Sequence, residues 1–339
     1  MEIKPMYTLP SLEPICSIST VAVLTSGGDA PGMNAAIRGV VRSALSQNIS
    51  VFGIQRGFSG LLQDDMHLLN SSSVSNIVQR GGTFLKSARC PEFHDSNNRH
   101  RAAKILSQRG IEALIVIGGD GSLTGAHLFE EETGIPVIGL PGTIDNDIFG
   151  TEDTIGFDTA MNTALDAIDR IRDTADSHER HFLVEVMGRN SGFLATHVGI
   201  AAGAEMILVP EYAINIEEVA LQLATSRRSG MGSSGIIVVA EGNKPNLTHG
   251  IAQQLEQHGL TPHISILGHI QRGGRPSGHD RVLASCLGSI SIDYLLAGYS
   301  DIMVGVSDGS VVDVPLDDLI RYRKGLDPEL LKIALQLHK

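Results

Sequence analysis

Short runs of apolar, mostly β-branched residues recur along the chain and predict buried β-strands. Helical patterns lie between these runs. Near-continuous apolar strands that alternate with helices indicate parallel sheets covered on both faces, which is the α/β class. The predicted strands are Val21–Leu24, Leu114–Ile117, Pro136–Leu140, Phe182–Val186, Ile236–Ala240 and Ile264–Leu267.

Each predicted strand ends in a segment that combines glycine with a charged or hydrogen-bonding residue. Glycine lets the backbone approach a phosphate closely and lets its amides point at it. A single glycine after a strand more often marks only a turn. Ligands of parallel sheets bind beyond the carboxyl ends of the strands, so the recurrence of this pattern predicts one site. The segments are SGGDAPG (26–32), GGDGS (118–122), PGTIDND (141–147), MGRNSG (187–192), EGN (241–243) and GHIQRGG (268–274).

Two common phosphate-binding signatures are missing from the chain. The motif GxxxxGK[ST] does not occur, and Gly119-Asp120-Gly121 runs on to Gly125 with one residue too many for GxGxxG. These absences disfavour a P-loop kinase and a Rossmann dehydrogenase.

The length and charge of the chain indicate the number of lobes and exclude some partners. With 339 residues the chain exceeds the usual size of one domain, so we expect two lobes. The formal net charge of -12 repels nucleic acid and acidic membranes, and we expect neither as a partner. An anionic substrate must therefore be met by clustered arginines and backbone amides.

The cysteines and the N-terminal residues bear on localisation. Cys16, Cys90 and Cys286 are scattered and form no zinc-binding pattern, which favours a reducing cytoplasm. No segment approaches the roughly 20 apolar residues needed to cross a bilayer. The first residues lack the apolar stretch of a signal peptide, so residues 1–16 are interpreted as an extension of unknown use. We expect a cytoplasmic protein.

From Thr20 to Tyr299 the chain resembles the bacterial ATP-dependent 6-phosphofructokinases. SGGDAPGMNAAIRG, GGTFLKSAR, GGDGS, PGTIDND, MGR and GHIQRGG occur in family order. GGDG is shared with NAD kinases and lipid kinases, whereas TIDND followed by MGR and GHIQRGG is peculiar to phosphofructokinases. The resemblance implies a glycolytic enzyme that transfers the γ-phosphoryl group of MgATP to the 1-hydroxyl of fructose 6-phosphate, giving fructose 1,6-bisphosphate and ADP.

The resemblance also implies an architecture. The family has two Rossmann-like α/β lobes with mainly parallel sheets and an active-site cleft between them, and it usually forms homotetramers. Because the family chain crosses between lobes more than once, we expect an ATP-binding lobe of residues 17–155 and 270–320. Residues 156–269 and 321–339 would form the sugar-phosphate-binding lobe.

Family roles carry over to the residues of the chemical step. Phosphoryl transfer needs a positioned nucleophile, a metal on the nucleotide phosphates and donors for the equatorial oxygens. Asp145, the first aspartate of TIDND, would accept the proton of the sugar hydroxyl. Asp120 would be the main carboxylate contact of Mg²⁺ and Asp147 would orient its shell, which suffices because Mg²⁺ commonly takes only one or two carboxylates. The donors would be Thr143, Arg89 and Arg189.

The nucleotide would be held by loops rich in glycine and by the end of GGTFLKSAR. Two glycines favour ATP as the phosphoryl donor. Pyrophosphate-dependent relatives typically carry aspartate in place of Gly121 and lysine in place of Gly142. A side chain at Gly121 would obstruct the α-phosphate. The implied nucleotide-binding residues are Gly27, Gly28, Arg89, Cys90, Gly119, Asp120, Gly121, Ser122 and Gly125.

The sugar phosphate would be bound by residues of four motifs. Arg180 would reach the 6-phosphate across a subunit interface, and His263 stands where the family has a second such arginine. The active site would then require an oligomer. The implied set is Thr143, Asp145, Asp147, Arg180, Met187, Gly188, Arg189, Glu241, His263, His269 and Arg272.

The family's effector site is only partly present. Arg38, Arg42, Arg172 and Glu205 match positions that bind ADP or phosphoenolpyruvate in allosteric members. A further family arginine aligns with Ser71. Where the family usually has a lysine-rich stretch, this chain has Gly230–Ser234, which contains no lysine. Whether the upstream Arg227 and Arg228 replace these lysines is open. We expect a weak or altered response to these effectors.

Three other functions compete with this interpretation. A pyrophosphate-dependent phosphofructokinase is disfavoured by Gly121 and Gly142. A non-catalytic regulatory subunit should have lost a catalytic carboxylate or phosphate-binding arginine, whereas Asp120, Asp145 and Arg189 are present. A kinase for another ketose phosphate remains open, because sequence alone does not decide which ketose fits.

Overall fold

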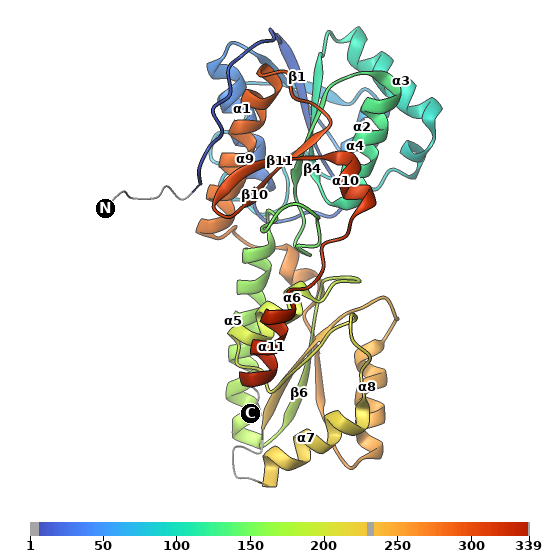
Figure 1. Ribbon diagram of the computed structural model, residues 1–339, viewed down its shortest axis with the longest axis vertical. Helices are drawn as coiled ribbons and strands as arrows, with labels where there is room; N and C mark the ends of the chain where they lie inside the picture. Colours follow the sequence, from blue (N-terminus) through green and yellow to red (C-terminus); the bar gives the residue numbers. More distant parts are fainter. Residues whose placement is uncertain (1–6, 229–233, 338–339) are drawn as a thin grey trace, which may run out of the picture. The chain divides into compact units, whose positions relative to one another are not determined.

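The computed structural model describes residues 7–228 and 234–337, which divide into two compact units (Figure 1). Unit 1 comprises the chain up to Asp158 together with Arg272–Lys324. Unit 2 comprises Thr159–Gln271 and the chain from Gly325 on. The sequence predicted the boundaries between the lobes after residues 155, 269 and 320, whereas the units of the structure change after Asp158, Gln271 and Lys324. Each unit is an α/β structure with a mainly parallel sheet, so the predicted fold class is confirmed.

In the described part of unit 1, seven strands form one sheet in the order β11-β10-β5-β4-β1-β2-β3. All neighbouring strands are parallel except the edge pairs β2/β3 and β10/β11. The central strand β4 is buried along its whole length, as expected for a strand covered by helices on both faces. The strands are β1 Thr20–Ser26, β2 Ser50–Ile54, β3 Met66–Leu69, β4 Ala113–Gly118, β5 Val137–Pro141, β10 Ile302–Ser307 and β11 Ser310–Pro315.

Two helices of unit 1 cross at very short range. A Cβ atom added to Gly39 of α1 would lie 2.7 Å from the Ser285 carbonyl oxygen, and one on Gly288 of α9 would lie 2.3 Å from the Ala36 carbonyl oxygen. Only glycine lets the two backbones approach so closely. The helices of unit 1 are α1 Met33–Ser46, α2 Gly57–Leu62, η1 Pro91–His94, α3 Ser96–Gln108, α4 Asp120–Thr133, α9 Gly278–Leu296 and α10 Leu316–Arg321.

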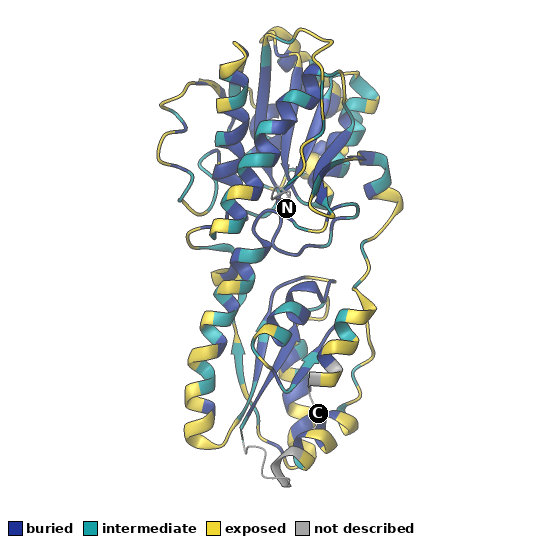
Figure 2. Ribbon diagram, turned by 60° about the vertical axis from the view of Figure 1, so that its left-hand side comes forward, coloured by how far each residue is buried: buried dark blue, intermediate teal, exposed yellow. Residues whose placement is uncertain are grey.

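In the described part of unit 2, four strands form a parallel sheet in the order β7-β8-β6-β9. Figure 2 shows exposed outer faces on several of the helices around it, whereas α6 is mostly buried and β8 is buried along its whole length. The strands are β6 His181–Val186, β7 Met206–Leu208, β8 Gly235–Ala240 and β9 His263–Ile266. The helices are α5 Phe157–His178, α6 Phe193–Ala201, α7 Ile216–Arg228, α8 Leu247–Gln257, η2 Gly268–Arg272 and α11 Pro328–Leu337.

The described residues of the N-terminal extension pack on unit 1. Thr8 donates to the Gly309 carbonyl oxygen (2.8 Å) and accepts from the Val311 amide (2.9 Å), which extends the sheet beyond its edge strand β11. The amides of Ile15 and Cys16 donate to the Leu296 carbonyl oxygen at the end of α9. At Thr8 the extension thus satisfies two backbone groups of the sheet edge. Among the described residues, no helix meets the length and apolarity required to span a bilayer.

Candidate active site

Three of the glycine-containing loops start side by side in unit 1. Ser26 of β1 pairs with Gly118 of β4, which pairs in turn with Pro141 of β5. From β1 the chain continues to β2 on one side, whereas β4 continues to β5 on the other side. The loops after β1 and β4 therefore diverge at a topological switch point, where α/β sheets bind ligands.

The glycines of these loops allow close contacts. Gly27 has φ +84°, and a Cβ atom on it would lie 3.2 Å from the Ser122 hydroxyl oxygen. A Cβ atom on Gly119 would lie 3.6 Å from the Cβ atom of Thr143. The structure thus brings together residues that the sequence assigned to the nucleotide and to the chemical step. Gly125, which the sequence also assigned to nucleotide binding, instead faces the rings of Phe58 and Phe93.

The two glycines that distinguish ATP-dependent relatives have different surroundings. A Cβ atom on Gly121 would meet no atom within 4 Å, so this position borders open space. A Cβ atom on Gly142 would lie 3.0 Å from the Met33 side chain and 3.1 Å from that of Ile117. A lysine at Gly142 would therefore displace its neighbours, whereas an aspartate at Gly121 fits sterically.

The loop that carries Asp145 is held by its own hydrogen bonds. The Asp145 amide donates to the Thr143 hydroxyl (3.2 Å), and the Thr154 hydroxyl donates to the Thr143 carbonyl oxygen (2.7 Å). Asn146 adopts φ 52° and donates its side-chain amide to the Glu152 carbonyl oxygen (2.9 Å). Asp145 is 3% exposed. The carboxyl group assigned as the base is thus placed by a preformed loop.

Asp120, the first residue of α4, forms an ion pair that the sequence did not predict. Its Oδ2 atom lies 2.7 Å from Nη1 of Arg323. The hydrogen bond and charge of Asp120, with a smaller contribution from Asp147, raise the pKa of Arg323. Arg323 follows α10 and belongs to no motif, so no local signal marked it.

The carboxylates fit a magnesium ion that is shared with a nucleotide. Asp120 contacts the Arg323 guanidinium directly, and the charge of Asp147 adds a smaller contribution to the raised pKa of Arg323. Among the described residues, no cluster of three or more His, Cys, Asp or Glu could hold a metal by itself. One or two carboxylates completed by water and phosphate oxygens are the usual ligands of Mg²⁺.

Arg272, assigned to the sugar 6-phosphate, lies against the loop after β1. Its Nη1 atom donates to the Asp29 carbonyl oxygen (3.0 Å) and lies 2.3 Å from the position of a Cβ atom on Gly28. Arg89, assigned to ATP, is exposed. Cys90 is partly buried, and this burial raises the pKa of its thiol.

The other three loops start at neighbouring strands of unit 2. Val186 of β6 pairs with Ala240 of β8, and Glu185 pairs with Ile266 of β9. The MGR, EGN and GHIQRGG segments follow these strands. His269 is exposed and lies in unit 2, whereas Arg272 of the same segment lies in unit 1.

Side-chain acceptors hold the MGR loop. The Arg189 amide donates to Oε1 of Glu241 (2.9 Å), and the Met187 amide donates to Oε1 of Gln271 (2.9 Å). Gly188 has φ +142°, and a Cβ atom on it would lie 2.6 Å from the Ser191 carbonyl oxygen. Gln271 is fully buried and was not assigned from the sequence. Its place within GHIQRGG was the one signal that could have found it.

A cavity of about 320 Å³ lies beside Glu241. Glu185 also lines it, and Oε2 of Glu185 accepts from the Thr248 hydroxyl (2.5 Å). Asn243 and Lys244 add polar groups from the EGN loop. Glu241, the residue assigned to the sugar hydroxyls, thus lines a cavity together with further polar residues.

Two residues assigned to the sugar phosphate lie at the other end of the same sheet. Arg180 directly precedes β6, and His263 is the first residue of β9. Phe182 pairs with His263, and their rings lie 5.3 Å apart. Residues rise about 3.3 Å each along a strand, so the length of β6 separates Arg180 from the MGR loop by roughly 20 Å. Within unit 2 of one chain, Arg180 and His263 therefore do not meet the MGR loop.

The effector candidates fall into two pairs. In unit 2, Arg172 forms an ion pair with Glu205 (3.3 Å), and the other Glu205 oxygen accepts from the Ile236 amide. In unit 1, Arg42 donates to the carbonyl oxygen of Ser71 (3.0 Å), the residue that replaces a family arginine. Arg38 lies one turn earlier on α1 and is partly buried. Residues 229–233, in the stretch without lysines, lie outside the described residues.

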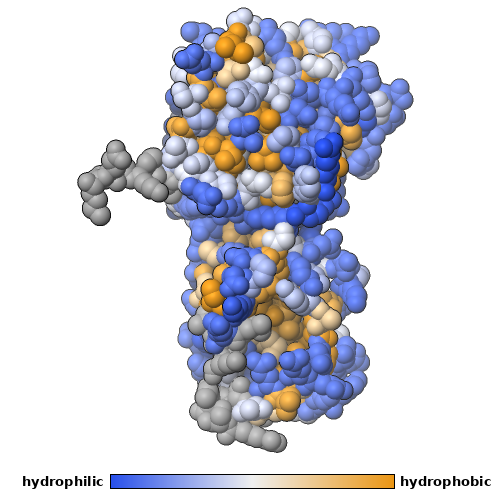
Figure 3. Space-filling view, in the orientation of Figure 1, coloured by the Kyte–Doolittle hydropathy of each residue, from blue (hydrophilic) through white to orange (hydrophobic). Residues whose placement is uncertain are grey.

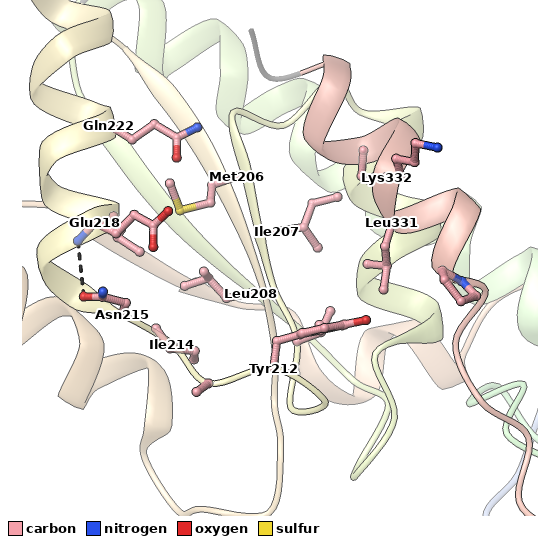
Figure 4. A pocket seen from close by; sticks show the side chains of 15 residues that line it. Met206, Ile207, Leu208, Tyr212, Ile214, Asn215, Glu218, Gln222, Leu331 and Lys332 are labelled. Atoms are coloured by element: carbon pink, nitrogen blue, oxygen red, sulfur yellow. Dashed lines mark hydrogen bonds between the residues drawn. The ribbon is translucent and has the colours of Figure 1, made fainter.

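A second cavity of unit 2, of about 380 Å³, contains no residue assigned from the sequence (Figure 4). Apolar side chains of β7 and α11 line it, including Met206, Leu208 and Leu331. Glu218 and Gln222 of α7 add polar groups on one side. The loop that follows β7 also lines it, whereas no residue of the MGR, EGN or GHIQRGG segments does.

Both units thus present glycine-containing loops at the carboxyl ends of adjacent parallel strands. Together with buried Asp145 and with Asp120 at the start of α4, this defines an α/β protein suited to phosphoryl transfer. The family model for phosphofructokinase matches residues 20–295, and the chain belongs to the phosphofructokinase family.

Individual relatives agree with this membership. The chain is 51% identical over 315 residues to ATP-dependent 6-phosphofructokinase 1 of Thermus thermophilus, covering 93% of this chain and 98% of the relative. The structure of phosphofructokinase from Saccharomyces cerevisiae matches with a TM-score of 0.83 and 34% identity, over 94% of this chain and 46% of that one. A pyrophosphate-dependent phosphofructokinase from Marinobacter aquaeolei matches with a TM-score of 0.81 over 92% and 86% of the two chains, but at 23% identity it supports the fold alone.

Proposed function

We propose that this member of the family is an ATP-dependent 6-phosphofructokinase, which transfers the γ-phosphoryl group of ATP to the 1-hydroxyl of fructose 6-phosphate. The observation that carries the proposal is the similarity to curated enzymes of that name over 93% of the chain. The carboxylates Asp120, Asp145 and Asp147 and the MGR and EGN residues lie on strand-end loops or at the start of the helix that follows, whereas Arg180 and His263 lie at the other end of their strands.

In this reaction Asp145 accepts the proton of the sugar hydroxyl as the hydroxyl oxygen attacks the γ-phosphorus. Its position on a loop held by hydrogen bonds supports this role, since a general base must be placed within hydrogen-bond reach of the proton it takes. Thr143, Arg89 and Arg189 donate hydrogen bonds to the oxygens of the transferring group.

Asp120 and Asp147 hold the Mg²⁺ that accompanies ATP. When bound, the metal neutralises charge on the nucleotide phosphates. Gly27, Gly28 and the residues Gly119–Ser122 approach these phosphates with backbone amides, where the open space at Gly121 leaves room for the nucleotide. Unit 1 is therefore the proposed nucleotide-binding unit.

Unit 2 is the proposed sugar-phosphate-binding unit. Met187, Gly188, Arg189, Glu241 and His269 lie on its strand-end loops and contact the sugar phosphate. Arg272 of unit 1 adds a further cation for the phosphate. The cavity beside Glu241 supports this proposal.

Arg180 and His263 act on the 6-phosphate of a neighbouring subunit. Their position at the far end of the sheet supports this arrangement, because one chain does not bring them to its own MGR loop. We accordingly propose a homotetramer with shared active sites. The effector positions Arg38, Arg42, Arg172 and Glu205 already bind partners within the protein or lack their family neighbours, which supports a weak allosteric response.

The three cysteines are free thiols, which suits the cytoplasm that we propose for the enzyme.

A matrix assay tests the substrate assignment. The purified protein is offered ATP or pyrophosphate with fructose 6-phosphate, tagatose 6-phosphate or sedoheptulose 7-phosphate, and the bisphosphate product is measured. Turnover with ATP and fructose 6-phosphate should exceed every other combination. A preference for pyrophosphate or for another ketose phosphate would refute the assignment.

Mixing inactive variants tests the shared site. Asp145→Asn and Arg180→Ala homo-oligomers should each be nearly inactive. After dissociation and joint reassembly, some sites combine intact Asp145 with intact Arg180, so activity should return. Failure of the mixed oligomer to regain activity, with both variants folded, would refute a site shared between subunits.

A further inference from the structure

Three consecutive residues after α10 dock on the loops that surround Asp120 and Asp145. The ring of Tyr322 packs on that of Phe149, with centroids 5.1 Å apart. The Arg323 guanidinium pairs with Asp120 (2.7 Å), and the Lys324 ammonium donates to the Glu152 carbonyl oxygen (2.9 Å). The segment 322–324 is therefore anchored on both sides of Arg323.

This segment lies on the surface of unit 1. Figure 3 shows hydrophilic residues, in blue, over α10 and the residues that follow it. The Arg323 side chain is 72% exposed, whereas Lys324 is sufficiently buried that its pKa falls to about 8. Lys324 and Tyr322 thus fix the backbone, and the Arg323 side chain is free to change rotamer without moving it.

The target of Arg323 is the residue assigned as the main metal ligand. A guanidinium stays charged at every physiological pH and offers a fork that matches a carboxylate. Its contact with Oδ2 of Asp120 occupies an atom that a divalent cation would bind directly. Two positive groups on one carboxylate repel each other, so they compete for it.

We propose that Arg323 holds Asp120 in the metal-free protein and must leave it when the divalent cation that accompanies the nucleotide binds. The inference rests on the proposed role of Asp120 as a metal ligand. Arg323 then serves as an internal counter-charge for Asp120 when the metal is absent. It also lowers the affinity for the bare cation, so that the metal binds preferentially together with its anionic nucleotide.

The test is a titration of the nucleotide-free protein with Mn²⁺ at low ionic strength, in which free Mn²⁺ is followed by electron paramagnetic resonance. Exposed ion pairs are typically worth about 0.2–1 kcal/mol, so removing the competitor in Arg323→Gln should tighten Mn²⁺ binding by about 1.4- to fivefold. Arg323→Lys keeps the charge and should stay near the wild-type affinity.

Two further variants complete the design. Arg321→Gln removes the same charge two residues away, but Arg321 pairs with Asp317, so this control should bind Mn²⁺ as the wild type does. Asp120→Asn should weaken binding strongly in either background. The readout is metal binding and does not depend on turnover.

The outcomes separate the two hypotheses. If Asp120→Asn weakens Mn²⁺ binding while Arg323→Gln matches the wild type or Arg321→Gln, the competition is refuted and the metal site stands. If Asp120→Asn leaves Mn²⁺ binding unchanged, the assignment of Asp120 as a ligand is refuted, and the role of Arg323 falls with it.

Discussion

Both units bring three glycine-containing loops to the ends of three adjacent parallel strands, yet they hold these loops by different means. In unit 1 the register of β5, β4 and β1 and the hydrogen bonds within the 143–154 loop do so. In unit 2 the side chains of Glu241 and Gln271 accept hydrogen bonds from the MGR backbone.

This difference decides which side chains hold the loops in each unit. In unit 1 the loop that carries Asp145 is held by the Thr143 and Thr154 hydroxyls and by the Asn146 side-chain amide, so Asp145→Asn keeps these hydrogen bonds. In unit 2 the side chains of Glu241 and Gln271 hold the MGR loop by accepting hydrogen bonds from its backbone. A substitution at a unit 1 carboxylate should therefore change the chemistry and leave the loop in place, whereas one at Gln271 should displace a loop.

The largest effect is expected for Asp145→Asn in unit 1. Loss of a positioned general base should lower kcat by roughly 100- to 10,000-fold while the melting temperature and ATP affinity stay close to the wild type. Steady-state kinetics and calorimetry measure these quantities. Asp308→Asn, in an exposed turn, is the matched control. A wild-type kcat in Asp145→Asn would exclude this residue as the base.

Gly121→Asp in unit 1 should impair ATP binding more than sugar-phosphate binding. The position has steric room, and an acidic residue in the first turn of α4 is compatible with the helix, so stability should not fall. Like charges placed together at a binding site cost several kcal/mol, so the KM for ATP should rise by about tenfold or more. Gly121→Ala should bind ATP normally. Equal KM values for ATP in all three proteins would show that the nucleotide lies elsewhere.

Gln271→Leu should affect the sugar side of unit 2. It leaves the buried Met187 amide without its acceptor, which typically costs about 1–3 kcal/mol and should raise the KM for fructose 6-phosphate by about tenfold. The KM for ATP should change little. Gln257→Leu, on the exposed end of α8, controls for the loss of an amide. Equal effects on both KM values would contradict a role confined to the MGR loop.

The smallest effect concerns the pH dependence of stability in unit 1. A hydrogen bond to Asp153 (3.0 Å), and then the charges of Asp153, Asp158 and Asp280, raise the pKa of His279 against the opposing effect of its partial burial. A raised folded-state pKa means that this stabilisation is complete below the unfolded value near 6.5 and is lost as pH rises through the folded value.

His279→Gln should therefore lower the free energy of unfolding at pH 6 and have little effect at pH 9. Because both partners are about one-third exposed, the difference should stay below about 1 kcal/mol. Urea denaturation at both pH values measures it. A deficit that grows with pH would contradict the assigned direction.

Much of the fold was visible in the sequence. Each of the strands predicted from apolar runs is present, with ends shifted by one or two residues, as in β1 and β5. The strands that escaped prediction are less distinctive: β7 has only three residues, and β2 and β3 are short strands near a sheet edge with exposed polar positions. β10 and β11 form an antiparallel hairpin joined by Asp308-Gly309, a local signal that the sequence analysis did not use.

The sequence by itself determined the class of fold, the family, and the loops that carry glycine and carboxylate residues, because a strand, a turn and a phosphate-binding backbone are encoded within a few neighbouring residues. Only the tertiary structure decided which loops lie together, since strand order depends on pairings between distant segments. It also decided that Arg180 and His263 lie away from the MGR loop, and that Arg323 meets Asp120. Such contacts arise from the packing of elements far apart in the chain, for which no local pattern exists.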